Sequence, residues 1–361
     1  MVLQKLKKIV QKVASNPLVR ATRRNGTRAT TTTFSSTYAL SVPYHWAAFL
    51  NFMREQRSVM AGKKQYYKNL NVEVTSNALL RRNVHRLEKG LTMQPLRDVF
   101  AENYIFETTQ IYSQTQTRYL NSKESVDVDE LTWANNVLKQ YFDTVIETKK
   151  ILKAKTLFED CKFSPEETDS IPYQRGEQIN LPSYEQILSL SKYRRSVRWF
   201  LDKPVERTLI DQALVVAREA PSACNRLPYE FRIFDKPNLV SKISNLPFGT
   251  TGYADNIPVI AVLVGRLDNY FSARDRHAIY IDTSLAAMSF AFALETLGLS
   301  SCMINWPDFE PLERKMAKTL NLKQYERPIM LMAIGYPDPI ALVANSKKKS
   351  LDTIRSYNKT K

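Results

Sequence analysis

The hydrophobic pattern changes character near the middle of the chain. From Tyr44 to about Phe158 apolar residues recur at three- and four-residue steps, which predicts helices. After Ser183, short apolar or alternating runs stand between amphipathic segments, which predicts strands mixed with helices. The pattern therefore predicts a mostly helical N-terminal region over residues 41–162 and an α+β domain over residues 183–361. A proline-containing stretch with few large apolar side chains, residues 162–182, is the predicted linker.

The second half is predicted to build a sheet covered by helices. Tyr229, Phe231 and Ile233 alternate with polar residues, which indicates a strand with one buried face. The near-continuous apolar run from 257 to 264 is typical of a central strand. Interleaved helices and strands of this kind predict a three-layer domain with a central mixed sheet flanked by helices. Further strands are predicted at 301–304 and 328–334, and helices at 184–190, 204–220, 283–297 and 311–320.

The predicted helix from Thr283 to Leu297 differs from the others because it is apolar on all sides. A helix of this composition is buried, either in the core of the domain or at a subunit interface. Asp282 or Thr283 is the expected N-cap, and Gly298 is expected to close the helix.

Residues 1–40 form a basic arm. In residues 1–13 the apolar side chains share one helical face, and four lysines lie largely elsewhere. Residues 21–37 are rich in Thr, Ser and Arg and show no apolar periodicity, so they are expected to be flexible. Residues 1–54 carry nine Lys and Arg and no Asp or Glu, so they supply +9 of the net charge of +16. Three interpretations stay open: a solvated tail, peripheral contact with an anionic membrane surface, and a transit peptide.

Common catalytic and metal-binding motifs are absent from the sequence. It contains no GxGxxG, GxxxxGK[ST], GxSxG or HExxH pattern, and three separate cysteines with three separate histidines argue against a disulfide framework or a zinc site. No apolar run reaches the ~18 residues that a membrane span needs. These features favour a cytoplasmic protein, with the basic arm as its one candidate for contact with the inner membrane face.

Two dense polar clusters lie on either side of the helix at 204–220. The first combines three guanidinium groups with a hydroxyl, in Arg194, Arg195, Ser196 and Arg198. Because Arg side chains donate paired hydrogen bonds to phosphate oxygens, this cluster predicts an anion clamp. The second, residues 221–225, has the composition of a tight turn that offers amide donors to a polar, planar group.

Together the clusters resemble the nitroreductase family of flavin enzymes. The resemblance rests on Arg-Arg-Ser-x-Arg-x-Phe, then the amphipathic helix, then Ala-Pro-Ser-Ala-x-Asn-x-x-Pro-Tyr, and it covers the chain from about Ser183 to the end. It implies an FMN bound at the interface of a homodimer, NAD(P)H as the electron donor, and an electron-poor small molecule as the acceptor. No side-chain base is then needed, because the flavin carries the chemistry.

The resemblance also implies roles for individual residues. It places the FMN phosphate on the arginine cluster and a basic residue near the C-terminus, and it places the turn of the partner subunit at the edge of the flavin ring. Leu227 departs from the family pattern, which commonly has Gln there, so one polar flavin contact is missing. The implied cofactor-binding residues are Arg194, Arg195, Ser196, Arg198, Pro221, Ser222, Ala223, Asn225, Asn305 and Lys348.

Other interpretations are compatible with the same residues. The domain could be a flavin-binding or non-catalytic scaffold docked at a membrane surface, with a link to surface-polysaccharide synthesis. A nucleic-acid-binding role is disfavoured because no recognition motif accompanies the basic arm. His85 and Glu88 share a helical face and could form an acid–base pair, but an ordinary surface helix with Gly90 as its C-cap explains them better. Cys224 is interpreted as a small packing residue.

Overall fold

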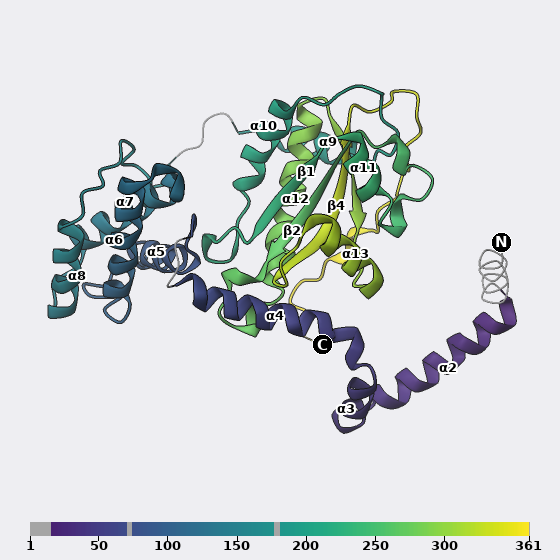
Figure 1. The fold of residues 1–361 in the computed structure, drawn as a ribbon, viewed down its shortest axis with the longest axis horizontal. Coiled ribbons are helices and arrows are strands. Elements are labelled where there is room, and N and C mark those ends of the chain that lie inside the picture. Colours follow the sequence, from purple (N-terminus) through teal and green to yellow (C-terminus); the bar gives the residue numbers. More distant parts are fainter. Residues whose placement is uncertain (1–15, 71–73, 177–180, 361) are drawn as a thin grey trace. The chain divides into compact units, whose positions relative to one another are not determined.

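The computed structural model describes residues 16–70, 74–176 and 181–360 (Figure 1). The chain divides into two compact units, with the boundary between Arg57 and Ser58 inside helix α4 (Phe49–Asn69). The predicted amphipathic segment at residues 1–13 lies outside the described residues.

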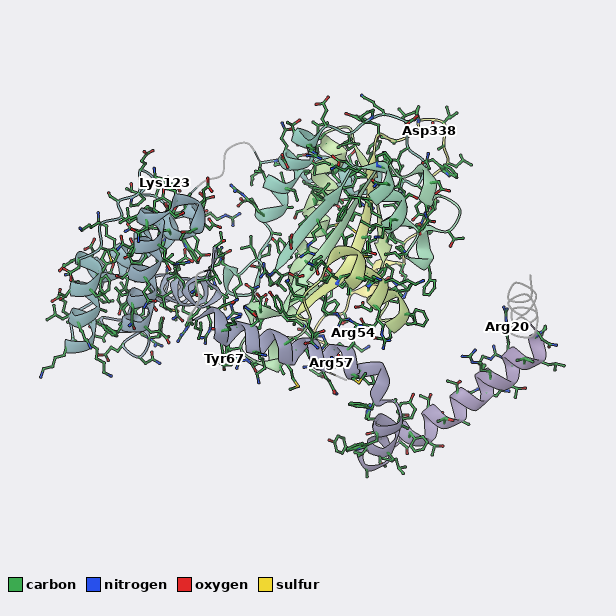
Figure 2. The ribbon with its side chains drawn as sticks, in the orientation of Figure 1. Arg20, Arg54, Arg57, Tyr67, Lys123 and Asp338 are labelled. Atoms are coloured by element: carbon green, nitrogen blue, oxygen red, sulfur yellow. The ribbon has the colours of Figure 1, made fainter. Side chains whose placement is uncertain are left out.

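The first unit is helical and exposed. Its helices are α2 (Pro17–Ser35), α3 (Tyr38–Ala47) and the beginning of α4. The expectation of an irregular run at 21–37 is wrong, because Asn16 caps α2 and Pro17 occupies its first turn, two features that favour a helix start. No residue of α2 is buried, and its side chains, Arg20 among them, project away from the helix along its length (Figure 2).

The second unit begins with a helical subdomain, which confirms the predicted helical character of this region. Its members are α5 (Ala78–Leu91), α6 (Ile105–Asn121), α7 (Val128–Thr144) and α8 (Lys149–Glu159). Leu80, Leu87, Leu131 and Tyr141 are fully buried in their common core. Gly90 is not a C-cap as predicted. It lies inside α5, where its missing side chain lets the Phe100 ring pack directly against the backbone.

The rest of the second unit is built on a four-stranded sheet. Its strands are β1 (Tyr229–Phe234), β2 (Val259–Arg266), β3 (Ser300–Asn305) and β4 (Glu326–Gly335), in the order β1-β2-β4-β3. The predicted α+β class and the central position of β2 are confirmed. All three strand pairs are antiparallel, and the parallel component of the expected mixed sheet is, among the described residues, a single bridge from Ser196 to Ser301.

The predicted three layers follow from the alternation of side chains along the strands. Ile260, Val262 and Val264 point to the face that is covered by α11 (Pro237–Ser244) and α13 (Glu310–Leu320). Val259, Ala261 and Leu263 point to the opposite face, which α10 (Arg207–Arg218) and α12 (Ala278–Thr296) cover. Figure 1 shows the two helix pairs on opposite sides of the sheet. Both faces of β2 are therefore buried, which explains its continuous apolar sequence.

Helix α12 begins one and a half turns earlier than predicted. Asp282 and Thr283 are buried inside the helix and are not its N-cap, which is His277. Gly298 follows the helix with a φ of +76°, as expected for a glycine that closes a helix. By length and composition the helical stretch at 273–296 could cross a membrane, but half of its apolar window is buried inside this unit. That burial matches the first of the two predicted locations, the core of the domain, and the second, a subunit interface, stays a prediction.

Candidate functional site

The arginine cluster is held in place by helix α9 (Tyr184–Tyr193) and the edge of the sheet. Ser183 and Gln186 form a capping box that fixes the start of α9, as the Ser183 cap predicts. The helix ends at Arg194, and the following backbone pairs with β3, where Val197 N–H donates to the Ser301 carbonyl at 3.1 Å. Val197 and Phe200 are buried, so the backbone that carries the neighbouring polar side chains is anchored.

The arginines of the cluster retain unused hydrogen-bonding capacity. Arg194 Nε is buried and has no hydrogen-bond partner. The Arg198 guanidinium lies 5.8 Å from the centre of the Tyr253 ring, and its own hydrogen bond goes to the Ser196 carbonyl at 3.5 Å. Among the described residues, no ion pair is recorded for Arg194, Arg195 or Arg198. Unpaired guanidinium groups at one place favour an anionic ligand.

The turn at 221–227 has a strained backbone. Cys224, Asn225 and Leu227 have φ values of +57°, +49° and +46°, a backbone conformation that residues other than glycine rarely adopt. Strain of this kind persists only where neighbouring groups enforce it. Ser222 Oγ accepts a hydrogen bond from Leu227 N–H at 3.1 Å inside the turn, and Arg81 Nε on α5 donates to the Asn225 carbonyl at 2.6 Å.

Asp282 on α12 supports the same turn from the other side. Its Oδ2 accepts hydrogen bonds from Ala223 N–H at 2.9 Å and from the Tyr270 hydroxyl at 3.2 Å. Burial raises the pKa of the Asp282 carboxyl above its ordinary value of 3.8, against the lowering effect of these two donors and of Arg226. A buried carboxylate thus fixes the backbone N–H of Ala223, one of the turn's predicted ligand-binding residues.

Replacing Asp282 by Asn is expected to change the pH dependence of stability. Because the folded state raises the pKa of Asp282, it binds the proton more tightly than the unfolded chain, so the free energy of unfolding falls as pH rises through that pKa. Asn does not titrate and keeps an oxygen acceptor. The difference in the free energy of unfolding between wild type and Asp282→Asn should therefore decline, in urea unfolding, as the pH rises above the ordinary carboxyl pKa of 3.8. Parallel stability curves would contradict this role.

The two predicted clusters lie at opposite ends of α12. The turn contacts Asp282 near the beginning of the helix. The arginine cluster lies near its end, at Glu295. Burial raises the pKa of the Glu295 carboxyl, and the nearby Arg194 guanidinium partly opposes this shift. These acidic residues are about 20 Å apart along the helix axis, at 1.5 Å per residue. One chain therefore does not bring its arginine cluster and its turn together, as the resemblance anticipates for a site shared by two subunits.

The remaining predicted residues lie apart from both clusters within one chain. Asn305 is exposed at the far end of β3, about 13 Å along the strand from Ser301. Lys348 is exposed in the irregular segment before α14 (Leu351–Ile354). Their roles remain predictions.

Two residues near the turn were not predicted as site residues. Arg81 belongs to the polar-dense run at 81–90, which is a visible signal, but nothing in the sequence shows that it reaches residue 225. Asp282 was expected only as a helix cap. His85 Nδ1 lies 3.3 Å from Glu88 Oε2, and Glu88 Oε1 accepts from the Trp133 indole at 2.9 Å, so this pair has a structural role. The described residues contain no group of three or more His, Cys, Asp or Glu placed to hold a metal.

The family to which this domain is similar emerges from comparison with known proteins. Residues 192–255 and 245–336 match the model of the nitroreductase family. Human iodotyrosine deiodinase 1 is 24% identical over 228 residues, covering 54% of this chain and 78% of that protein. A Methanothermobacter thermautotrophicus protein described as an NADH dehydrogenase/NAD(P)H nitroreductase is 25% identical over 156 residues, covering 42% and 77%. The structure of an FMN-dependent nitroreductase from Clostridium difficile has a TM-score of 0.42 and 22% identity, covering 48% of this chain and 99% of that one.

Proposed function

We propose that the protein is an FMN-dependent enzyme that uses NAD(P)H to reduce an electron-poor small molecule. The proposal starts from residues 192–336, which match the nitroreductase family and therefore form an oxidoreductase domain. The observation that carries the proposal is the arginine cluster at 194–198, where none of the three guanidinium groups forms an ion pair among the described residues, although Glu295 is near enough to Arg194 to interact electrostatically. Such a cluster matches the charge and geometry of a phosphate group.

The residues present fit FMN. The buried and unpartnered Nε of Arg194 needs an acceptor, which a phosphate would supply. Arg195, Ser196 and Arg198 add further donors on the same anchored backbone. The strained turn, held by Asp282 and Arg81, offers Ser222, Ala223 and Asn225 to the edge of a planar ring. Leu227 contributes its backbone to the turn but no polar side chain.

A shared site between two copies of the chain follows from the separation of the clusters. The arginines of one subunit would hold the phosphate while the turn of the other subunit contacts the flavin ring. Helix α12 leaves apolar side chains exposed on one face, including Ile281 and Leu285, which are 59% and 43% exposed. A second copy covering this face would bury them and complete the site.

The overall reaction is a hydride transfer between two small molecules. The dihydronicotinamide loses a hydride and becomes NAD(P)+, and the acceptor gains that hydride together with a proton from solvent. FMN, when bound, supplies a reversible hydride carrier between donor and acceptor. The protein's own groups would bind the phosphate and hold the turn. No titrating side chain is required for proton delivery.

Titration with FMN tests the cofactor assignment. We expect the full-length protein to bind FMN with a stoichiometry of one per chain, and the mixture to oxidise NADH or NADPH when an electron-poor nitroaromatic compound is added. Failure to bind FMN would refute the proposal, whereas binding without turnover would identify the flavin-binding scaffold instead.

A second acceptor class is suggested by the iodotyrosine deiodinases among the relatives. Reductive dehalogenation replaces a carbon–halogen bond by a carbon–hydrogen bond, with two electrons and a proton consumed and halide released. Measuring iodide release from iodotyrosine beside nitroaromatic reduction, with the same FMN-loaded protein and donor, distinguishes the two acceptors.

A further inference from the structure

A cavity outside the arginine cluster lies where the helical subdomain meets the strained turn. Its volume is about 530 Å³, which is within the ~300–1,000 Å³ range of small-molecule sites. Its wall combines residues from the end of α4, the start of α5, the turn, and the segment after β2. The polar residues that line it include Asn77, Arg81, Arg226, Tyr229, Arg266 and Asp268.

Arg226 is the cation in this wall that lacks a counter-ion of its own. It is only 5% exposed, its Nε has no hydrogen-bond partner, and its recorded contact is with the face of the Tyr270 ring at 4.9 Å. Asp282 is near enough to interact electrostatically with Arg226, but its hydrogen bonds go to Ala223 and Tyr270. A buried guanidinium without an acceptor is costly unless a ligand supplies one.

The other two arginines in the wall are already paired with carboxylates. Arg81 is paired with the buried Glu130 at 3.2 Å, and Arg266 is paired with Asp268 at 2.8 Å. Asp127 also lines the cavity, and its Oδ1 accepts the backbone N–H groups of Asp129 and Glu130 as the cap of α7. Asp127 offsets the formal charge of Arg226, but it forms no ion pair with Arg226, so this guanidinium has no carboxylate bound to it among the described residues.

The hydroxyl of Tyr229 also favours an anion. It is buried without a partner, and burial raises the pKa of Tyr229 to about 12, so the hydroxyl remains a donor at neutral pH. The beginning of α5 adds no free donor, because Asn77 Oδ1 accepts from Leu79 N–H and Leu80 N–H. Leu79 and Leu227 add apolar surface to the cavity wall.

We propose that this cavity binds a small molecule bearing a carboxylate or phosphate group, with the oxyanion on Arg226 and Tyr229. The site is separate from the predicted phosphate clamp, because Arg226 lies with the turn at the other end of α12 from Arg194. It also depends on the helical subdomain, which supplies Arg81 and Asn77 and lies outside the residues that match the family model. The proposal therefore gives this subdomain a role in ligand binding that does not require bound flavin.

Calorimetric titration of the full-length protein with three matched probes tests the proposal. Benzoate and phenyl phosphate represent the two oxyanions, and benzamide is the neutral control. Arg226→Met should weaken binding of the preferred anion by about tenfold or more, because it removes a charge-assisted hydrogen bond. Tyr229→Phe, which removes only an unpartnered hydroxyl, should weaken it by about threefold. Arg207→Met, at the exposed pair with Asp235, is the matched control and should bind like wild type.

The outcomes separate clearly. Tighter binding of either anion than of benzamide, with the loss confined to the Arg226 and Tyr229 variants, supports the site, and the preferred probe identifies the oxyanion class. No binding of either anion to wild type overturns the proposal. Equal affinity in Arg226→Met overturns it as well. If that variant does not fold, unchanged affinity in Tyr229→Phe does the same. Because the readout is binding of these probes, failure here leaves FMN binding at the arginine cluster untouched.

Discussion

Replacing Arg195 and Arg198 together by alanine is expected to weaken FMN binding by about a hundredfold or more. Each guanidinium is proposed to donate charge-assisted hydrogen bonds to the phosphate, and such bonds contribute about 1.5–3 kcal/mol each. Arg195 precedes the buried Val197 and Arg198 lies between Val197 and the buried Phe200, so both side chains leave an anchored backbone and their removal should not disturb the fold. The loss of FMN affinity is measured by titrating the variant with FMN and monitoring the quenching of flavin fluorescence.

A control with equal loss of charge separates specific binding from general electrostatics. Arg207 and Arg314 are exposed and pair with Asp235 and Glu310, away from the cluster. The double variant Arg207→Ala with Arg314→Ala should bind FMN like wild type. Equal losses in the two double variants would contradict a specific phosphate clamp.

Replacing Leu285 by Arg is expected to dissociate the proposed dimer and abolish FMN binding at the same time. Leu285 lies on the exposed apolar face of α12, and a charge there would be desolvated without a partner in the interface. Since the arginine cluster and the turn of one chain are at opposite ends of this helix, a monomer has only half of the site. Light scattering after size-exclusion chromatography gives the mass, and FMN titration gives the affinity.

The matched control is Leu342→Arg, at a leucine that is 95% exposed in the segment after β4. It makes the same chemical change outside α12, so mass and FMN affinity should both remain those of wild type. A monomeric Leu285→Arg protein that still binds FMN tightly would show that one chain forms the site alone. A variant that remains dimeric would place the interface elsewhere.

Much of the fold is predictable because the burial of each strand face determines which positions of the sequence are apolar. The alternation at Tyr229–Phe234 and the apolar run of β2 reflect burial on one and on two faces. Helix boundaries are harder to predict from the sequence. The polar residues Asp282 and Thr283 resemble an N-cap, but both lie inside α12. Asp282 is tolerated there because its buried carboxylate accepts a hydrogen bond from Ala223 N–H. Helix α2 was missed because no apolar periodicity marks a helix that buries nothing.

The candidate site was predictable where its residues are adjacent in sequence. Arg194–Arg198 and Pro221–Asn225 form continuous motifs, so their chemistry can be recognised before their positions are known. The support of the turn by Arg81 joins residues that are 144 positions apart, and sequence periodicity contains no information on such a contact. That Arg226 has no paired carboxylate likewise depends on which carboxylates pair with Arg81 and Arg266.

The most direct measurement of the central claim is the visible absorbance of the FMN-loaded protein during anaerobic addition of NADH and then NADPH. The proposed oxidoreductase should lose its flavin absorbance with one equivalent of the preferred donor and regain it when a nitroaromatic acceptor is added. A protein that acquires no flavin spectrum with FMN, or whose bound flavin is reduced by neither nicotinamide, would contradict the account.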